Sequence, residues 1–253
     1  MKIGRFSFKG ETFFGAVKEE KVLKIENPFS QIELVGKEYQ LKELKILPPV
    51  LPSKIIAVGL NYKDHARELG MKIPDEPIIF FKPPTAVIGH EQDIFLPPES
   101  KEVHYEGELA VVIGKTLYRP RSFKEVESAI LGYTCFNDVT ARDLQRKDGQ
   151  WTRSKSFNTF APLGPFIVKD LDPTDLKIQT RINGKIVQNS STKELIFKPI
   201  ELVYFISHIM TLLPGDVIAT GTPPGVGPLN SGDTVEVEIE GIGVLKNYVQ
   251  ALM

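Results

Sequence analysis

Short apolar segments separated by turn residues are the feature of this sequence that most limits its fold. The 253 residues include 20 glycines and 19 prolines. Segments such as KIIAVGL, PIIFFKP, LAVVIG, DTVEVEIEG and GVLKNYV have the length and composition of strands. Two others indicate helices: SFKEVESAILGYTCFND should begin as a helix and continue as a strand, and KPIELVYFISHIMTLL should form an amphipathic helix. We therefore predict a β-rich α+β fold, a mixed β-roll or barrel-like sheet with a few peripheral helices.

A proline cluster near residue 50 predicts a domain boundary. Residues 1 to 47 alternate short apolar stretches with turn residues, which is typical of a small β domain. The stretch LPPVLPSK then interrupts the chain. We predict a small N-terminal β domain at residues 1–50 and a larger domain at residues 51–253.

Charge and cysteine content exclude several classes of partner and site. The 31 basic and 32 acidic residues nearly cancel, so the sequence predicts no nucleic-acid or membrane partner. The start MKIGRFSFKG lacks the apolar run of a signal peptide, which favours a cytoplasmic location. The single cysteine, Cys135, excludes an intrachain disulfide and a thiolate zinc cage. Any metal must therefore be bound by oxygen or imidazole.

The segment VHYEGELAVVIGK contains a pair of acidic residues that could bind a metal. On a strand, Glu106 and Glu108 project to one side, while Leu109 and Val111 face the other. Neighbouring carboxylates that lead into an apolar strand need a cation, and hard ions such as Mg²⁺ prefer oxygen ligands. The alternative is an exposed strand end with two solvated glutamates. Asp138, in GYTCFNDVTARDLQ, is a third candidate ligand or else the N-cap of a helix.

Two helical pairs could bind or transform a small acidic molecule. Arg142 and Gln145 are three residues apart and share a helix face, where a guanidinium and an amide can contact a carboxylate. His65 and Glu68 have the same spacing, so the carboxylate could orient the imidazole as a general base. Both pairs could instead lie on a solvated surface.

Two further positions are candidates for binding an anion. Lys155 lies among aromatic residues in WTRSKSFNTFAPLGP, which would partly desolvate its ammonium group. Thr222 lies in the constrained turn TGTPPGVGP, where backbone amides and a hydroxyl can hold an anion. Taken singly, each signal is modest.

Together, the motifs resemble those of the fumarylacetoacetate hydrolase superfamily. The segments KIIAVGLNYKDHARELG, IIFFKPPTAVIG, YEGELAVVIGK, GYTCFNDVTARDLQ, RSKSFNTFAPLGP, INGKIVQNSS and DVIATGTPPGVGP occur in the family's order, over about residues 54 to 249. The chain looks most similar to the small acylpyruvase and homoprotocatechuate-pathway isomerase/decarboxylase branch. This resemblance implies a β-roll catalytic fold, a bound divalent metal and a homodimer.

The resemblance also implies roles for nine residues. It assigns metal binding to Glu106, Glu108 and Asp138, with Mg²⁺, Mn²⁺ or Ca²⁺ as the ion; catalysis to His65, Glu68 and Lys155; and substrate contact to Arg142, Gln145 and Thr222. Larger hydrolases of the family have an acidic residue where this chain has Asn61, so we expect water rather than a fourth carboxylate there.

The implied substrate is a small 2-oxo acid whose enolate a metal stabilises. The leading prediction is metal-dependent hydrolysis of the C–C bond of an acylpyruvate or related β-diketo acid. The alternative is a 2-hydroxyhepta-2,4-diene-1,7-dioate isomerase, a 5-oxopent-3-ene-1,2,5-tricarboxylate decarboxylase, or an oxaloacetate decarboxylase or tautomerase. A third possibility is an inactive protein that binds an oxo acid. The sequence does not separate these outcomes.

Overall fold

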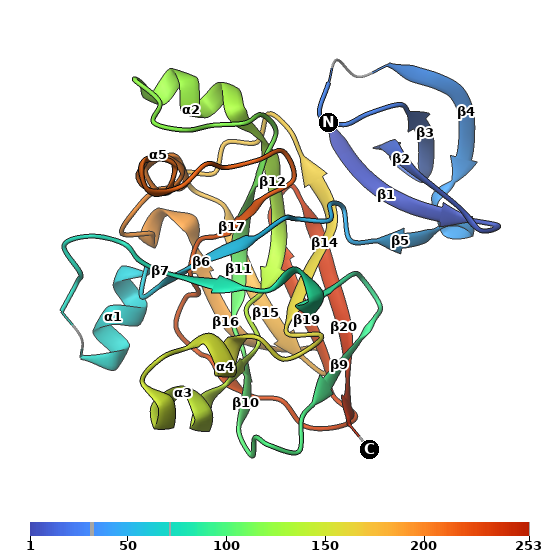
Figure 1. The fold of residues 1–253 in the computed structure, drawn as a ribbon. Coiled ribbons are helices and arrows are strands. Elements are labelled where there is room, and N and C mark those ends of the chain that lie inside the picture. Colours follow the sequence, from blue (N-terminus) through green and yellow to red (C-terminus); the bar gives the residue numbers. More distant parts are fainter. Residues whose placement is uncertain (31–32, 71, 253) are drawn as a thin grey trace.

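Three β-sheets form the centre of the molecule, and short helices lie around them (Figure 1). The structure, a computed structural model, describes residues 1–30, 33–70 and 72–252. The sheets have 12, three and five strands, and within these residues none of them closes into a barrel. The prediction of a β-rich fold with few helices is confirmed.

The N-terminal strands form a lobe at the end of the large sheet. They are β1 (Lys2–Phe8), β2 (Glu11–Lys18), β3 (Lys21–Ile25), β4 (Leu34–Gln40) and β5 (Lys45–Leu47), with the short helix η1 (Leu41–Glu43) between the last two. Phe6, Phe13 and Tyr39 pack in a core of their own. Strand β1 also pairs with β14, so the lobe continues the large sheet. The boundary near residue 50 stays a prediction.

The rest of the large sheet includes the predicted strand segments KIIAVGL, PIIFFKP and LAVVIG. Its strands are, in spatial order, β14 (Ala161–Val168), β12 (Ile130–Asn137), β11 (Gly107–Ile113), β17 (Val217–Ala219), β6 (Ile55–Gly59) and β7 (Ile78–Lys82), and β8 (Val87–Ile88) pairs with β14 after the turn η2 (Pro84–Ala86). Strand β11 is buried on both faces, because Leu109 and Val111 pack in one core cluster and Ala110 and Val112 in another.

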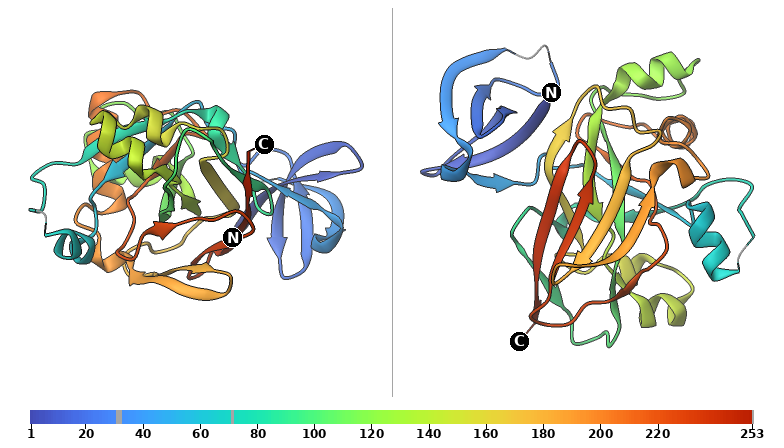
Figure 2. Two further views of the ribbon diagram at one scale, coloured as in Figure 1. Left: turned by 90° about the horizontal axis from the view of Figure 1, so that it is seen from below. Right: turned by 180° about the vertical axis from the view of Figure 1, so that it is seen from behind.

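The five-stranded sheet packs against the large sheet. Its order is β16 (Lys185–Ser191), β15 (Lys177–Ile182), β19 (Thr234–Ile239), β20 (Gly243–Ala251) and β9 (Asp93–Leu96). These strands lie side by side in the rear view of Figure 2, with the N-terminal lobe at the upper left. Val237 and Leu245 share a core cluster with Leu109 of β11. The hairpin predicted at Asn183 and Gly184 is confirmed, and both residues have the positive φ that its turn requires.

The remaining elements flank these two sheets. The three-stranded sheet has the order β13 (Thr140–Ala141), β10 (Val103–Tyr105), β18 (Gly227–Pro228). The helices are α1 (Lys63–Leu69), α2 (Phe123–Ala129), α3 (Arg142–Asp148), α4 (Thr152–Lys155), α5 (Pro199–Ile209) and the single turn η3 (Thr192–Glu194). None of the helices in the described part of the chain has the length and apolarity needed to cross a membrane.

One helix is shorter than predicted. The amphipathic segment was expected to remain helical through Leu213, but α5 ends at Ile209. The chain then extends, and the backbones of Leu117 and Leu212 exchange two hydrogen bonds of 2.9 Å each. This pairing with a distant segment replaces the last helical turn.

Candidate active site

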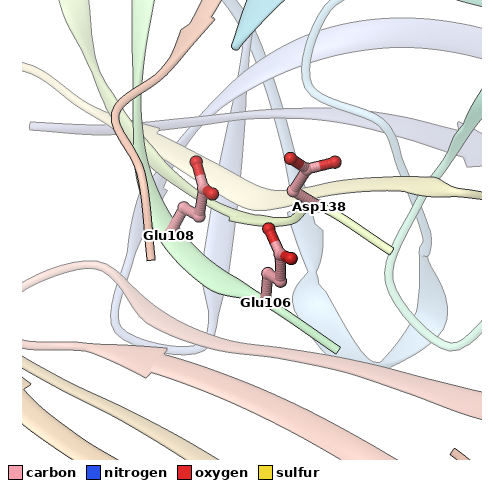
Figure 3. Close-up of side chains that lie close together, drawn as sticks. All are labelled: Glu106, Glu108 and Asp138. Carbon is pink, nitrogen blue, oxygen red and sulfur yellow. The ribbon is translucent and has the colours of Figure 1, made fainter. Parts of the chain in front are cut away.

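Three buried carboxylates meet where β11 begins and β12 ends. Glu106, Glu108 and Asp138 each offer an oxygen, and these atoms lie within 4.8 Å of one another. Figure 3 shows the two glutamates projecting to the same side, towards Asp138. Antiparallel pairing causes this meeting, because the Asp138 N–H donates to the Glu106 carbonyl at 2.8 Å.

The structure decides two alternatives that the sequence left open. The exposed fractions of Glu106, Glu108 and Asp138 are 7%, 1% and 1%, so the pair is not a solvated strand end. Asp138 is not a helix cap, because the N-cap of α3 is Ala141. The glycine between the glutamates permits a close approach, since a Cβ on Gly107 would lie 2.2 Å from the Thr180 hydroxyl.

Three cations surround two of these carboxylates. Lys155 Nζ lies 2.9 Å from Glu106 and 2.6 Å from Asp138, Lys82 Nζ lies 2.5 Å from Asp138, and Arg142 donates to Glu106. Burial opposes ionisation of Glu106, but the charges of Lys155 and Arg142 outweigh it and lower its pKa to about 2. Burial lowers the pKa of Lys82 to about 8, although Asp138 partly offsets this effect.

Glu108 differs from the other two carboxylates in its partners. It accepts a hydrogen bond of 2.8 Å from the Gly221 N–H, and no ion pair among the described residues includes it. Burial raises its pKa well above the usual value, and the charges of Asp138 and Glu106 raise it further. A buried carboxylate that forms no direct ion pair within the described residues, beside two other carboxylates, fits an all-oxygen site for a hard divalent cation.

The residues predicted to contact substrate lie around this cluster. Arg142 donates to Gln145 at 2.6 Å as well as to Glu106, so α3 holds its guanidinium at the carboxylates. The Thr222 hydroxyl donates to the Gly107 carbonyl at 3.0 Å and accepts from Gln188 at 2.9 Å. The single hydroxyl hydrogen of Thr222 is thus already donated, and the hydroxyl could donate to an anion only by giving up the bond to Gly107.

The predicted histidine pair is formed on α1. His65 Nδ1 lies 2.8 Å from a carboxylate oxygen of Glu68. Helix α1 is attached to neighbouring elements, because Ser190 donates to Asp64 at 2.6 Å. The Asn61 side-chain amide hydrogen-bonds to the backbones of Phe197 and Thr220, and these bonds fix the chain just before α1.

A cavity of about 340 Å³ joins these groups. Its lining consists of Val58, Gly59, Leu60, His65, Phe80, Glu106, Glu108, Arg142, Gln145, Arg146, Trp151, Lys155 and Thr222. Within the described residues, two of the predicted nine, Asp138 and Glu68, are not part of this lining. Each contacts a residue that is, because Asp138 binds Lys155 and Glu68 binds His65. The catalytic, metal and substrate roles of the nine remain predictions.

One wall of the cavity is apolar. The Phe80 and Trp151 rings lie 5.1 Å apart in an edge-to-face arrangement, and Lys155 Nζ lies 4.9 Å from the Phe80 ring centre. A Cβ on Gly59 would lie 2.7 Å from the Trp151 ring, so only glycine lets the ring pack there unmoved.

Three polar residues of the site were not predicted from the sequence. Lys82 ends the apolar strand β7, and a lysine in the segment IIFFKPP is the signal that could have identified it. Gln188 lies in the quoted segment INGKIVQNSS and binds Gly107 and Thr222. Arg146 follows Arg142 by one helical turn and also lines the cavity.

Comparisons with known proteins add to this geometry. The family model described as fumarylacetoacetate (FAA) hydrolase, C-terminal, matches residues 54–250, and one described as Rv2993c-like, N-terminal, matches residues 1–49. Oxaloacetate tautomerase Fahd2a, mitochondrial, of Rattus norvegicus is 46% identical over 215 residues, which are 81% of this chain and 68% of that protein.

Several solved structures resemble the whole chain. The 5-carboxymethyl-2-hydroxymuconate delta-isomerase from Mycobacterium smegmatis has a TM-score of 0.94 and 45% identity, and the match covers 100% of both chains. The maleylpyruvate hydrolase from Sphingobium sp. SYK-6, in complex with manganese(II) ion and pyruvate, has a TM-score of 0.83 and 27% identity, again over 100% of both chains.

Proposed function

The chain belongs to the fumarylacetoacetate hydrolase family, and from this premise we propose that it is an enzyme that transfers protons through the enolate of a small dicarboxylic 2-oxo acid. The observation that carries this proposal is the buried carboxylate cluster beside a cavity that also contains Lys155 and His65. The rat tautomerase and the mycobacterial isomerase, both more than 40% identical to this chain, favour proton transfer as the reaction.

The cluster of Glu106, Glu108 and Asp138 would hold the metal. When bound, a divalent cation supplies a Lewis acid that stabilises negative charge on the keto oxygen of the substrate. Mg²⁺ and Mn²⁺ both suit carboxylate ligands, and manganese is present in the related Sphingobium structure.

His65 and Lys155 would carry out the proton transfer and charge stabilisation. The contact between His65 Nδ1 and Glu68 leaves the other ring nitrogen available to take a proton from the substrate carbon and return it elsewhere. Burial disfavours the charged form of Lys155, but Asp138 and Glu106 outweigh this effect and raise its pKa. Lys155 therefore remains a cation that can stabilise the developing enolate.

Hydrolysis of an acylpyruvate is the second candidate, and the His65–Glu68 pair favours it. His65 would take a proton from water as the water attacks the distal carbonyl. The C–C bond then breaks, and its electron pair passes to the enolate of pyruvate. The Sphingobium hydrolase supports this reaction, but it is only 27% identical to the chain. We therefore place hydrolysis after proton transfer, which reverses the order favoured by the sequence.

A turnover panel tests the proposal. The purified protein with Mg²⁺ is assayed for tautomerisation of enol-oxaloacetate, isomerisation of hydroxymuconate-type dienes, decarboxylation of oxaloacetate and hydrolysis of acylpyruvates. We expect tautomerisation or isomerisation to be fastest. If no reaction exceeds its rate in Mg²⁺ buffer, the chain is instead an inactive protein that binds an oxo acid.

Replacing His65 by alanine should separate the reactions. A general base typically contributes about 10²- to 10⁴-fold in rate, so we expect proton transfer and hydrolysis to slow by roughly 100-fold or more. Decarboxylation needs no base to remove a proton and should slow less. Steady-state kinetics on the three reactions, with His208→Ala as the control, measure the difference. His208 bonds to the Tyr204 carbonyl and is not part of the described cavity lining. An equal loss in all three reactions would contradict the role of His65 as the base.

A further inference from the structure

Helix α3 presents two arginines to the cavity, and their partners differ. Arg142 and Arg146 are four residues apart, so they lie on one face of the helix, and both line the cavity. Arg142 is engaged by Glu106 and Gln145. Arg146 pairs instead with Glu102, which is not part of the described lining.

The guanidinium of Arg146 retains donors for a ligand. Of its five N–H groups, one on Nη1 bonds to Glu102 at 3.3 Å and one on Nη2 bonds to the other carboxylate oxygen. The two side chains are 60% and 34% exposed. An ion pair this exposed contributes little to stability, so a second carboxylate could share or displace Glu102.

Lys155, a third basic residue of the lining, has fewer free donors for a ligand. Lys155 Nζ already bonds to Glu106 and Asp138, which leaves one of its three N–H groups. The apolar side chains of the lining, such as Leu60, Phe80 and Trp151, carry no charge of their own that could compensate an anion. Arg146 is therefore the cavity cation whose counter-ion lies outside the carboxylate cluster.

We infer that Arg146 binds the distal carboxylate of the substrate and so sets a preference for dicarboxylic over monocarboxylic 2-oxo acids. This inference rests on the proposed function, in which a divalent cation held by the carboxylate cluster would stabilise negative charge on the keto oxygen of the oxo acid. A guanidinium can contact a carboxylate through two parallel hydrogen bonds, which gives strength and orientation. Without that charge, the apolar wall would favour a substrate with an uncharged tail.

The test compares two substrates of equal length in one reaction. Oxaloacetate carries a carboxylate where 2-oxobutyrate carries a methyl group. Exchange of the C3 hydrogens with solvent deuterium, followed by NMR in Mg²⁺ and corrected for the rate in buffer, can be measured for both. In Arg146→Gln, we expect the ratio of kcat/KM for oxaloacetate to that for 2-oxobutyrate to fall roughly tenfold or more, mainly through KM. Arg146→Lys should retain part of the preference.

Arg153→Gln is the matched control. Arg153 is also exposed and pairs with an aspartate through two nitrogens, but it does not belong to the described lining. In Arg153→Gln, the ratio of kcat/KM for oxaloacetate to that for 2-oxobutyrate should equal that of the unaltered protein. An unchanged ratio in Arg146→Gln, or an equal loss with both substrates, would overturn the inference.

A failure of the proposed function would give a different result. If the C3 hydrogens of neither substrate exchange faster with the unaltered protein than in buffer, the proposed function is wrong. Calorimetric affinities for the same two acids then test Arg146 directly. A tenfold lower preference for oxaloacetate in Arg146→Gln supports the inference, and an unchanged preference overturns it.

Discussion

Glu108→Gln is expected to abolish tight binding of Mg²⁺ or Mn²⁺ and to lower turnover by roughly 100-fold or more, because it removes one of three carboxylate donors. Loss of a residue that only contacts a metal ligand already reduces metal affinity or activity about 10- to 100-fold. The fold should persist, since an amide oxygen can still accept the Gly221 N–H. Because its pKa is raised, Glu108 tends to hold a proton in the metal-free protein, and a neutral amide then replaces a neutral carboxyl, so the metal-free variant should melt no lower than the unaltered protein. Calorimetric titration with the cation and thermal unfolding measure the two effects.

The raised pKa of Glu108 adds a second measurement to this prediction. A raised carboxyl pKa means that Glu108 holds a proton at pH values where ordinary carboxylates are ionised. A cation must displace that proton, so affinity should increase with pH and binding should release protons. Titration in buffers of different ionisation enthalpy detects the release, which Glu108→Gln should lack. Glu127→Gln, on the exposed face of α2, is the control. Unchanged cation affinity in Glu108→Gln would remove the metal assignment.

Lys155→Met is expected to slow every reaction that passes through an enolate. Loss of one group that stabilises developing charge typically lowers kcat by about 10²- to 10³-fold. The variant should also destabilise the metal-free protein, because Glu106 and Asp138 lose a buried partner. Breaking a buried ion pair costs about 3–5 kcal/mol, and we expect the lower part of this range because Arg142 and Lys82 remain.

Urea unfolding in chelator and in saturating Mg²⁺ measures the stability effect. The added cation should offset most of the loss in Lys155→Met, since it restores positive charge beside Glu106 and Asp138. Lys147→Met, an exposed lysine of α3, is the control and should change neither stability nor turnover. Full turnover in Lys155→Met would contradict the assigned role, and unchanged stability in chelator would show that its ion pairs contribute nothing to folding.

Local sequence signals predicted much of the fold. The Asn183–Gly184 turn specifies a hairpin through the positive φ of its two residues. The Ser122 side chain accepts the Glu125 N–H at the start of α2, and the apolar strand β12 follows that helix as expected. The predicted end of α5 was wrong because the observed end depends on backbone pairing between Leu212 and Leu117, which lies far from it along the chain.

The candidate site was predictable only in part, for a related reason. The carboxylates and the His65–Glu68 pair lie close together within their own sequence motifs, so they could be proposed from spacing. Lys82 and Gln188 enter the site through contacts with distant residues, since Lys82 lies 56 positions from Asp138 and Gln188 lies 81 positions from Gly107. The pairing of strands, rather than any local pattern, determines such contacts.

Hydrogen exchange at C3 of oxaloacetate is the most direct test of whether the carboxylate cluster supports enolate formation. NMR in deuterium oxide with Mg²⁺ follows replacement of the C3 protons, which requires the enolate but neither hydrolysis nor decarboxylation. We expect the unaltered protein to accelerate this exchange above the rate in Mg²⁺ buffer and Glu108→Gln to return it to that rate. Exchange no faster with the unaltered protein than in Mg²⁺ buffer would show that the cluster does not support enolate formation.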